Sequence, residues 1–310
     1  MKMNATENRE KSNMKTCLAI TMSLAFATAV VRGQNLPSYV SVIDGESPYY
    51  YNQLGTGLAP SIGTGTFVAD GTTGFGNDYF GNANDASYFT TGTSGLVLAG
   101  SAGLNVINES ANGDIGSMSM LIQAPNTTQT GSRYFFDNGD TSPNEFELKD
   151  SGGTLNMQVG NVAIGPGGGT WTLTSGTWYY FAATWNFSGA NSSTYGINYY
   201  LGPAGQPTSS LLSGFTQRGG SGNISSGAGL GGGGAVTVSG NLSQATDGFE
   251  DNNIAGFTEA LATFSNQLSV AQIDAQYDAL IIPEPSTLVL CSFGLAGLWA
   301  VASRRRAFKR

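Results

Sequence analysis

The chain has 310 residues, among them 45 Gly, 13 Lys and Arg, 21 Asp and Glu, two Cys and no His. Without His, it has no Ser-His-Asp or Cys-His catalysis and no imidazole metal site. The stretch between Gln34 and Pro283 holds three basic and 18 acidic residues, a formal net charge of −15. That charge argues against nucleic-acid binding, which depends on Lys and Arg to neutralise phosphates. Cys17 and Cys291 both lie outside this stretch, so it has no thiol for a disulfide or a zinc site.

Residues 1–33 predict a secretory signal peptide. A polar, positively charged segment ends at Lys15, and an uncharged apolar run follows from Cys17 to Val31. Small residues suited to cleavage come next, at Ala29 or Gly33. This order is typical of chains exported by the Sec machinery. The alternative interpretation of the apolar run is a buried helix.

The C-terminus combines three features in a fixed order. Pro283-Glu284-Pro285 is followed by an uncharged run of 18 residues, Ser286 to Ser303, and then by Arg304-Arg305-Arg306. A helix of that length spans about 27 Å, which is enough to cross a hydrocarbon core. The arginines favour the cytoplasmic side of the membrane. An ordinary tail anchor is the alternative.

This arrangement resembles the PEP-CTERM sorting signal of Gram-negative bacteria, and Glu284 between its prolines matches the motif without departure. The resemblance implies that an exosortase, a membrane cysteine protease-transpeptidase, recognises residues 283–310. It implies a protein held in the membrane by helix 286–303 before processing and then placed on the cell surface or in the extracellular matrix. The sorting residues that it implies, none of them catalytic, are Pro283, Glu284, Pro285, Arg304, Arg305 and Arg306.

Residues 34–282 predict one all-β domain. Short runs rich in Thr, Val, Ile, Tyr, Phe and Trp are separated by clusters of Gly, Ser, Asn and Asp, as in a two-sheet antiparallel sandwich. The expected strands are Gly65–Ala69, Ala86–Thr90, Leu96–Leu98, Ser117–Gln123, Ser132–Asp137, Glu145–Lys149, Thr154–Val159, Thr170–Thr174, Thr177–Trp185, Gly196–Leu201 and Ala235–Ser239.

One segment alone, Ser269–Leu280, predicts a helix. Ser269 is suited to the N-cap, and Ile273, Tyr277 and Leu280 fall on one apolar stripe.

The order of these elements resembles the LamG-like, concanavalin A-like jelly roll. Its best-marked match is Gly176-Thr-Trp-Tyr-Tyr-Phe-Ala-Ala-Thr-Trp185, and Ala255–Phe264 with Leu268–Ile273 matches the closing strand and short helix. The resemblance covers residues 88–280 and implies a jelly roll with one short C-terminal helix. In the family the closing strand usually carries Ile-Asp-Glu, where this chain has Phe257-Thr258-Glu259. The missing Asp weakens the case for a calcium site there.

Two acidic clusters are candidate calcium ligands, because Ca²⁺ takes six to eight oxygens, several of them from carboxylates. They are Asp137 with Asp140, and Asp247 with Glu250 and Asp251. The alternative is that these residues are polar turn positions.

Glu145 and Glu147 are the candidate catalytic pair of a glycosidase. They alternate with Phe146 and Leu148, so both point to one face of a strand, with Cα atoms about 6.7 Å apart. The alternative is simple alternation, with Phe146 and Leu148 buried and the glutamates exposed to water.

Trp171, Trp178 and Trp185 have two interpretations. They stack on sugar rings, or they belong to the core.

The function predicted from these observations is an exported, non-catalytic structural or adhesive protein that contacts polysaccharide. A calcium-assisted carbohydrate-binding module is the second prediction, and a polysaccharide-cleaving enzyme using Glu145 and Glu147 is the third. No cofactor other than Ca²⁺ is expected.

Overall fold

The computed structural model divides the chain into two units, residues 37–281 and the two ends, 1–36 with 282–310. The predicted signal peptide, the predicted membrane helix 286–303 and the sorting residues lie outside the described residues. Within the described residues, no helix is long and apolar enough to cross a membrane. The structure describes residues 36–70, 73–89, 95–99, 115–123, 132–137, 146–151, 153–159, 162–164, 170–188, 195–217, 235–238 and 257–281.

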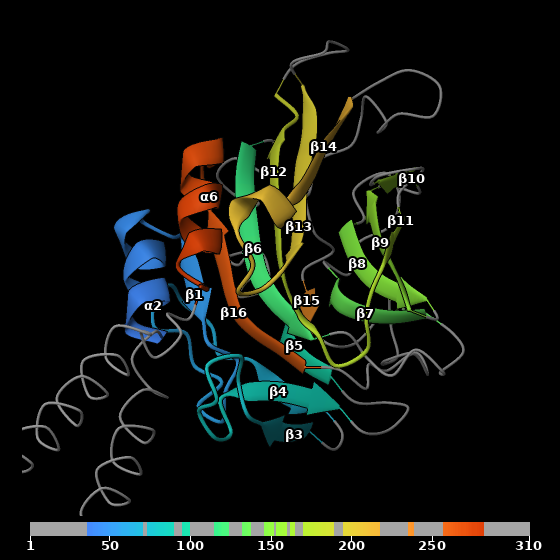
Figure 1. Cartoon of the computed structure of the whole chain (residues 1–310). Helices are drawn as coiled ribbons and strands as arrows, with labels where there is room; N and C mark the ends of the chain where they lie inside the picture. The colour runs from blue at the N-terminus through green and yellow to red at the C-terminus, as the bar shows by residue number, and fades with distance from the viewer. Residues whose placement is uncertain are drawn as a thin grey trace, which may run out of the picture. The chain divides into compact units, whose positions relative to one another are not determined.

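The first sheet, sheet A, is antiparallel (Figure 1). β1 (Tyr50–Asn52) pairs with β16 (Phe257–Phe264) outside the main order of strands. In spatial order, the main strands of sheet A are β14 (Leu212–Gln217), β13 (Gly196–Pro203), β12 (Trp178–Asn186), β6 (Ile115–Gln123), β16, β4 (Ala86–Phe89) and β3 (Thr73–Gly76).

The second sheet, sheet B, is also antiparallel, and β11 (Thr170–Thr172) pairs with β9 beside the main path. In spatial order, the main strands of sheet B are β10 (Val162–Ile164), β9 (Thr154–Val159), β8 (Phe146–Ser151), β7 (Ser132–Asp137), β15 (Ala235–Val238), β5 (Gly95–Ala99) and β2 (Val68–Asp70). In each sheet a late strand, β16 or β15, lies between two earlier strands, and the predicted all-β two-sheet sandwich is confirmed.

The core lies between the two sheets and follows the alternation of the strands. Sheet A contributes Met118, Met120 and Ile122 from β6 together with Phe181 and Trp185 from β12. Sheet B contributes the alternate residues Phe136, Phe146, Leu148, Leu155, Met157 and Val159. Burying large apolar side chains of this kind contributes about 1.5–3 kcal/mol each, which stabilises a domain without disulfides.

Two helices cover the outer side of sheet A and lie side by side: α2 (Leu36–Gly45) and α6 (Val270–Asp278) (Figure 1). The prediction of a single helix is therefore wrong. In α2, Tyr39 and Ile43 are fully buried, and their i, i+4 spacing puts them on one helical face against the sheet. The β-branched residues Val40, Val42 and Ile43 favour a strand locally, and tertiary packing overrides that preference.

The predicted helix α6 is confirmed, and so is its N-cap. The Ser269 hydroxyl accepts the Gln272 N–H while the Gln272 side chain accepts the Ser269 N–H, which completes a capping box. Ile273, Tyr277 and Leu280 are fully buried. The Tyr277 hydroxyl donates to the Pro203 carbonyl at 2.6 Å, so α6 is fastened to the end of β13.

A chain of side-chain hydrogen bonds joins the two helices to the sheet. The Tyr180 hydroxyl of β12 donates to Gln276 Oε1 at 2.7 Å, and Gln276 Nε2 of α6 donates to Glu46 Oε2 at 2.5 Å. Glu46 follows α2 directly. The first and last described elements of the domain are therefore held on the same face of sheet A.

Most predicted strands are observed within two residues of their expected ends. The exception is Gly65–Ala69, because β2 begins three residues later, at Val68. Thr170–Thr174 ends two residues early, at Thr172, because Thr174 begins the turn that leads into β12. Four observed strands, β1, β3, β10 and β14, carry no clear pattern and are not among the predicted strands. All six β14 residues are at least partly exposed, so that strand has no buried side of the kind that alternation reveals.

Candidate functional site

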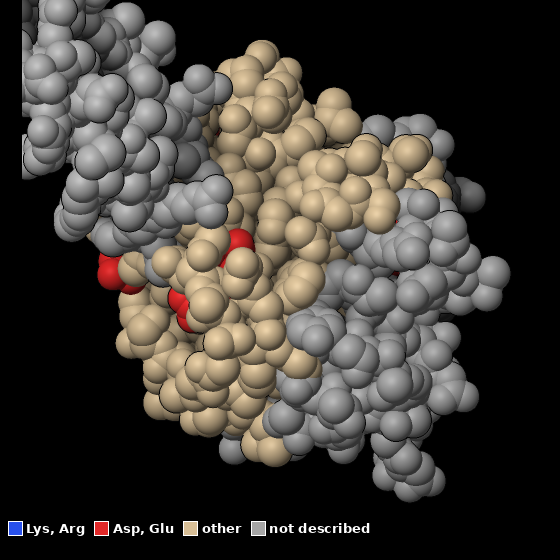
Figure 2. Space-filling model, turned by 60° about the horizontal axis from the view of Figure 1, so that its bottom comes forward, with Lys and Arg blue, Asp and Glu red and all other residues tan. Residues whose placement is uncertain are grey.

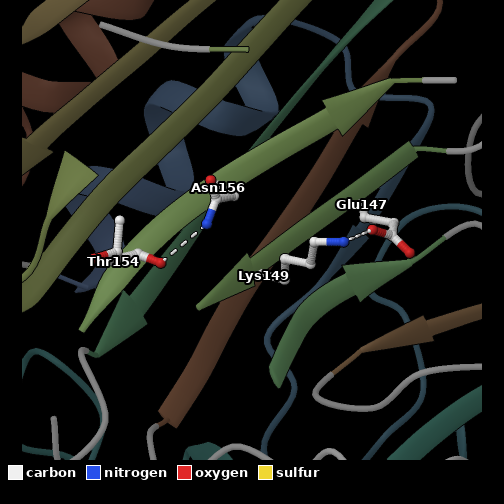
Figure 3. A network of polar contacts seen from close by, with 4 residues as sticks. All are labelled: Glu147, Lys149, Thr154 and Asn156. Atoms are coloured by element: carbon white, nitrogen blue, oxygen red, sulfur yellow. Dashed lines mark hydrogen bonds and ion pairs between the residues drawn. The ribbon is translucent and has the colours of Figure 1, made fainter. Parts of the chain in front are cut away.

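Polar side chains collect on the outer side of sheet B, where β8, β9 and β11 run next to one another (Figure 3). Alternation places them there, because Phe146, Leu148, Leu155 and Met157 turn inward between them. We call this set the polar face; it consists of Glu147 and Lys149 of β8, Thr154, Asn156 and Gln158 of β9, and Thr170 and Thr172 of β11.

The pairing of the strands aligns these side chains in rows. Lys149 is the cross-strand partner of Asn156, and Asn156 is the partner of Thr170 on the other side. Thr154 is likewise opposite Thr172. Thr170 and Thr172 are exposed and the β9 side chains are half-buried, so the face is most accessible along β9 and β11.

Glu147 and Lys149 of β8 form an ion pair on the side of the polar face that is nearest β7, with Lys149 Nζ 2.5 Å from Glu147 Oε2 (Figure 3). Lys149 Nζ also lies 5.4 Å from the centre of the Tyr134 ring, within the range of a cation–π contact. Glu147 is only 5% exposed, so the interpretation that leaves this glutamate in water is wrong. Its charge is compensated by Lys149 two residues further on, on the same side of the strand.

We expect Lys149→Met to destabilise the domain by about 2–4 kcal/mol, because it leaves the largely buried Glu147 carboxylate without a cation. The figure is below that for a fully buried pair, since Lys149 is still partly exposed. Urea denaturation at pH 7 measures the change. Adding Glu147→Gln to Lys149→Met removes the unpaired charge and is expected to recover most of the loss. Equal stability of the single and double variants would contradict this account of the pair.

The predicted catalytic pair is only partly described, because Glu145 lies outside the described residues. Glu147 is present on the polar face, but the described group bonded to it is a lysine. Asp137 of β7 is its cross-strand partner in the register of the sheet.

Of the predicted calcium ligands, the structure describes Asp137, which is 3% exposed. Asp140, Asp247, Glu250 and Asp251 lie outside the described residues. Across the part of the chain that is described, no group of three or more acidic, His or Cys side chains is arranged to hold a metal ion.

The structure places two of the three tryptophans in the core. Trp171 and Trp185 are 4% and 1% exposed and belong to the core. Trp178 is half-buried on the opposite face of β12 and packs against Tyr79 and Phe257, with ring centres 6.5 and 6.2 Å apart. None of the three lies on the polar face.

Tyr134, Asn156 and Gln158 were not predicted as site residues. Their strands were identified, but residues of these types carry no signal of their own in a β-rich sequence. Only the register of β7, β8 and β9 shows that they lie beside Glu147 and Lys149.

A family model described as the PEP-CTERM protein-sorting motif matches residues 282–306. The chain carries a PEP-CTERM sorting motif. The match includes all six predicted sorting residues, from Pro283 to Arg306. The PEP-CTERM motif implies export and recognition by an exosortase-type system. No curated protein matches the chain in sequence.

Solved structures share the fold of the PEP-CTERM protein's body at low sequence identity. One is described as the crystal structure of a receptor binding domain (TM-score 0.51, 13% identity, 78% of this chain and 53% of that chain). A second concerns botulinum neurotoxin type C, whose cell entry depends on interaction with two ganglioside molecules (TM-score 0.51, 11% identity, 78% and 52%). A third is domain 4 of AbnA, an arabinanase from Geobacillus stearothermophilus, with arabinotriose (TM-score 0.44, 14% identity, 74% and 98%).

The chain spans about half the length of the first two of these structures. The likeness to the first two structures shows the jelly-roll fold of the body, which is consistent with the predicted LamG-like, concanavalin A-like fold.

Proposed function

We propose that this protein is a non-catalytic structural or adhesive component of the cell surface or extracellular matrix, delivered there by its PEP-CTERM motif, and that its body contacts polysaccharide. The observation that carries the proposal is the sorting motif beginning at residue 282, directly after a jelly-roll body whose last described residue is Ile281.

The polar face is the surface that we assign to the polysaccharide. Amide and hydroxyl groups at Asn156, Thr170 and Thr172 donate and accept hydrogen bonds, which suits the hydroxyls of sugars. The rows of the register space these groups regularly along two paired strands. The interaction of botulinum neurotoxin type C with gangliosides is a precedent for glycan contact, taken from a structure that resembles this body in fold alone.

Pull-down with the matrix polysaccharide of the producing cells tests the proposal. The double variant Asn156→Ala, Thr170→Ala is expected to bind about tenfold more weakly, since each lost hydrogen bond costs about 0.5–1.5 kcal/mol. Ser213→Ala, an exposed hydroxyl on β14 of sheet A, is the matched control and keeps full binding.

Two further measurements in the same pull-down distinguish this proposal from a calcium-assisted binding module and from a polysaccharide-cleaving enzyme. Binding that disappears with EDTA would favour the calcium-assisted module, and shortening of the polysaccharide during incubation would favour the enzyme. Absence of binding by the unmodified protein to any matrix polysaccharide would contradict the polysaccharide contact and leave a purely structural role.

A further inference from the structure

A buried polar region, which we call the chamber, lies on the outer side of sheet A beneath α2 and contains Tyr39, Ser119 and Glu259. Its floor is a row of small side chains across three strands, Ala182 of β12, Ser119 of β6 and Ala262 of β16. All three are fully buried. Because these side chains are short, a large side chain can pack above them, and Tyr39 of α2 is fully buried close to Ser119 and Glu259.

Glu259 of β16 enters the chamber beside this row, opposite Leu121 of β6. A β-bulge between Glu259 and Ala262 sets its position, and Ala260 within the bulge has φ 55°, a left-handed conformation uncommon for residues other than glycine. The Ala260 N–H donates to the Gln53 carbonyl, which ties the bulge to the chain after β1. The backbone is thus held in an unusual shape at the residue next to a buried carboxyl.

The Glu259 carboxyl accepts too few hydrogen bonds to stabilise a buried negative charge. It is fully buried, and Oε2 accepts the Tyr79 N–H at 2.7 Å. Oε1 is buried and has no hydrogen-bond partner among the described residues. The hydroxyl groups of Tyr39 and Ser119 are also buried and also have no hydrogen-bond partner among the described residues. A carboxylate has about four acceptor sites, and this one has a single bond.

Among the residues that the structure describes, the groups around Glu259 offer no compensating positive charge. Each element packed against the chamber contributes acidic or neutral side chains: Asp78, Tyr79 and Asp85 between β3 and β4, Tyr39 of α2 with Asp44 and Glu46 at its end, Tyr51 of β1, Ser119 of β6, Tyr180 of β12 and Gln276 of α6. Lys149, the one basic residue whose side chain the structure describes, lies on β8 in the other sheet.

We propose that Glu259 is a proton-binding site of the domain: folding takes up one proton from solvent onto this carboxyl, and the neutral acid is the form that lets α2 and the β3–β4 connection close over the chamber. The neutral acid carries no net charge that the buried surroundings must compensate, and its O–H can donate a hydrogen bond to a neighbouring buried oxygen. The ionised form leaves an unpaired charge under α2, and such a charge is costly to bury.

The electrostatics of the chamber act in the same direction. Burial first, and then the negative charge of Asp78, raise the pKa of Glu259 well above its usual range, although the bond from Tyr79 opposes this. Burial, followed by the charge of Glu259, also raises the pKa of the Tyr39 phenol, so the two groups lie close enough to interact.

The consequence is a stability that falls as pH rises. A carboxyl whose pKa is higher in the folded than in the unfolded state stabilises the domain fully below the unfolded pKa of about 4.3. That contribution is lost as pH rises to the folded pKa. Within this window, one proton taken up on folding makes the unfolding constant rise about tenfold per pH unit.

Glu259→Gln tests the proposal, because it keeps the shape and the acceptor for the Tyr79 N–H but cannot ionise. We expect the unmodified protein, isolated from its producing cells, to unfold at a lower urea concentration at pH 9 than at pH 5. The midpoint of Glu259→Gln is expected to be nearly flat and higher at pH 9. Glu46→Gln is the matched control: burial also raises the pKa of Glu46, but this carboxyl is half-buried and already bonded to Gln276, so its removal keeps most of the slope.

A second measurement does not depend on the variant folding. The Cδ resonance of Glu259 in the unmodified protein reports its protonation directly, and we expect a neutral carboxyl at pH 7. A Cδ shift of an ionised carboxylate at pH 7, or a slope in Glu259→Gln equal to that of the unmodified protein, would overturn the proposal.

Discussion

Glu284→Ala is expected to leave the protein unprocessed, with its tail attached and the whole chain in the membrane fraction. Glu284 is the charged residue between the two prolines of the PEP-CTERM motif, and the motif match spans it. Its removal takes away the one ionic group with which an exosortase can recognise this triplet. Cell fractionation followed by intact mass measurement shows whether the tail remains.

Two companion variants make this result specific. Asp278→Asn changes an exposed acidic side chain at the end of α6, six residues earlier, and is expected to be processed normally. Glu284→Gln distinguishes the charge of the side chain from its shape. If Glu284→Ala were processed as fast as the unmodified protein, the triplet would not be the recognition element.

Trp185→Ala is expected to destabilise the domain by about 3–5 kcal/mol, a large fraction of the stability of a typical domain. Trp185 is 1% exposed on β12 of sheet A, and its ring packs against Phe146 of β8 in sheet B at 6.5 Å. It also covers Gly116, where a Cβ would lie 2.6 Å from the ring. Because both sheets close around this ring, its removal leaves a cavity that they fill only partly.

Trp178→Ala is the matched control for Trp185→Ala. It removes the same side chain from the same strand, seven residues earlier and therefore on the opposite face. Trp178 is only half-buried, so we expect a loss of about 1–2 kcal/mol. Urea denaturation of the domain measures both variants. Equal losses would mean that the space between the sheets is not the main core.

The sequence predicts the strands that carry one buried and one polar side, because alternation records which residues face the core. Leu155 and Met157 of β9 show this pattern clearly, and the bounds of that strand were predicted correctly. α2 was missed for the opposite reason. Its Val and Ile residues favour a strand, and the burial of Tyr39 and Ile43 that holds it as a helix depends on a sheet assembled from distant parts of the chain.

The candidate site was only partly predictable for a related reason. The glutamates of β8 were recognised as sharing one face, yet the burial of Glu147 depends on Lys149 and on the neighbouring strands. Glu259 stood out in the sequence only as part of a departure from a family pattern. Its burial beneath α2 follows from a bulge and from a helix that alternation does not reveal.

The most direct test of the account is the intact mass of the native protein recovered from outside the cytoplasm of its producing cells. The account predicts a product that has lost the apolar segments at both ends and retains the whole β-rich body, residues 37–281. Recovery of the native chain from the cytosol with both ends intact would contradict it.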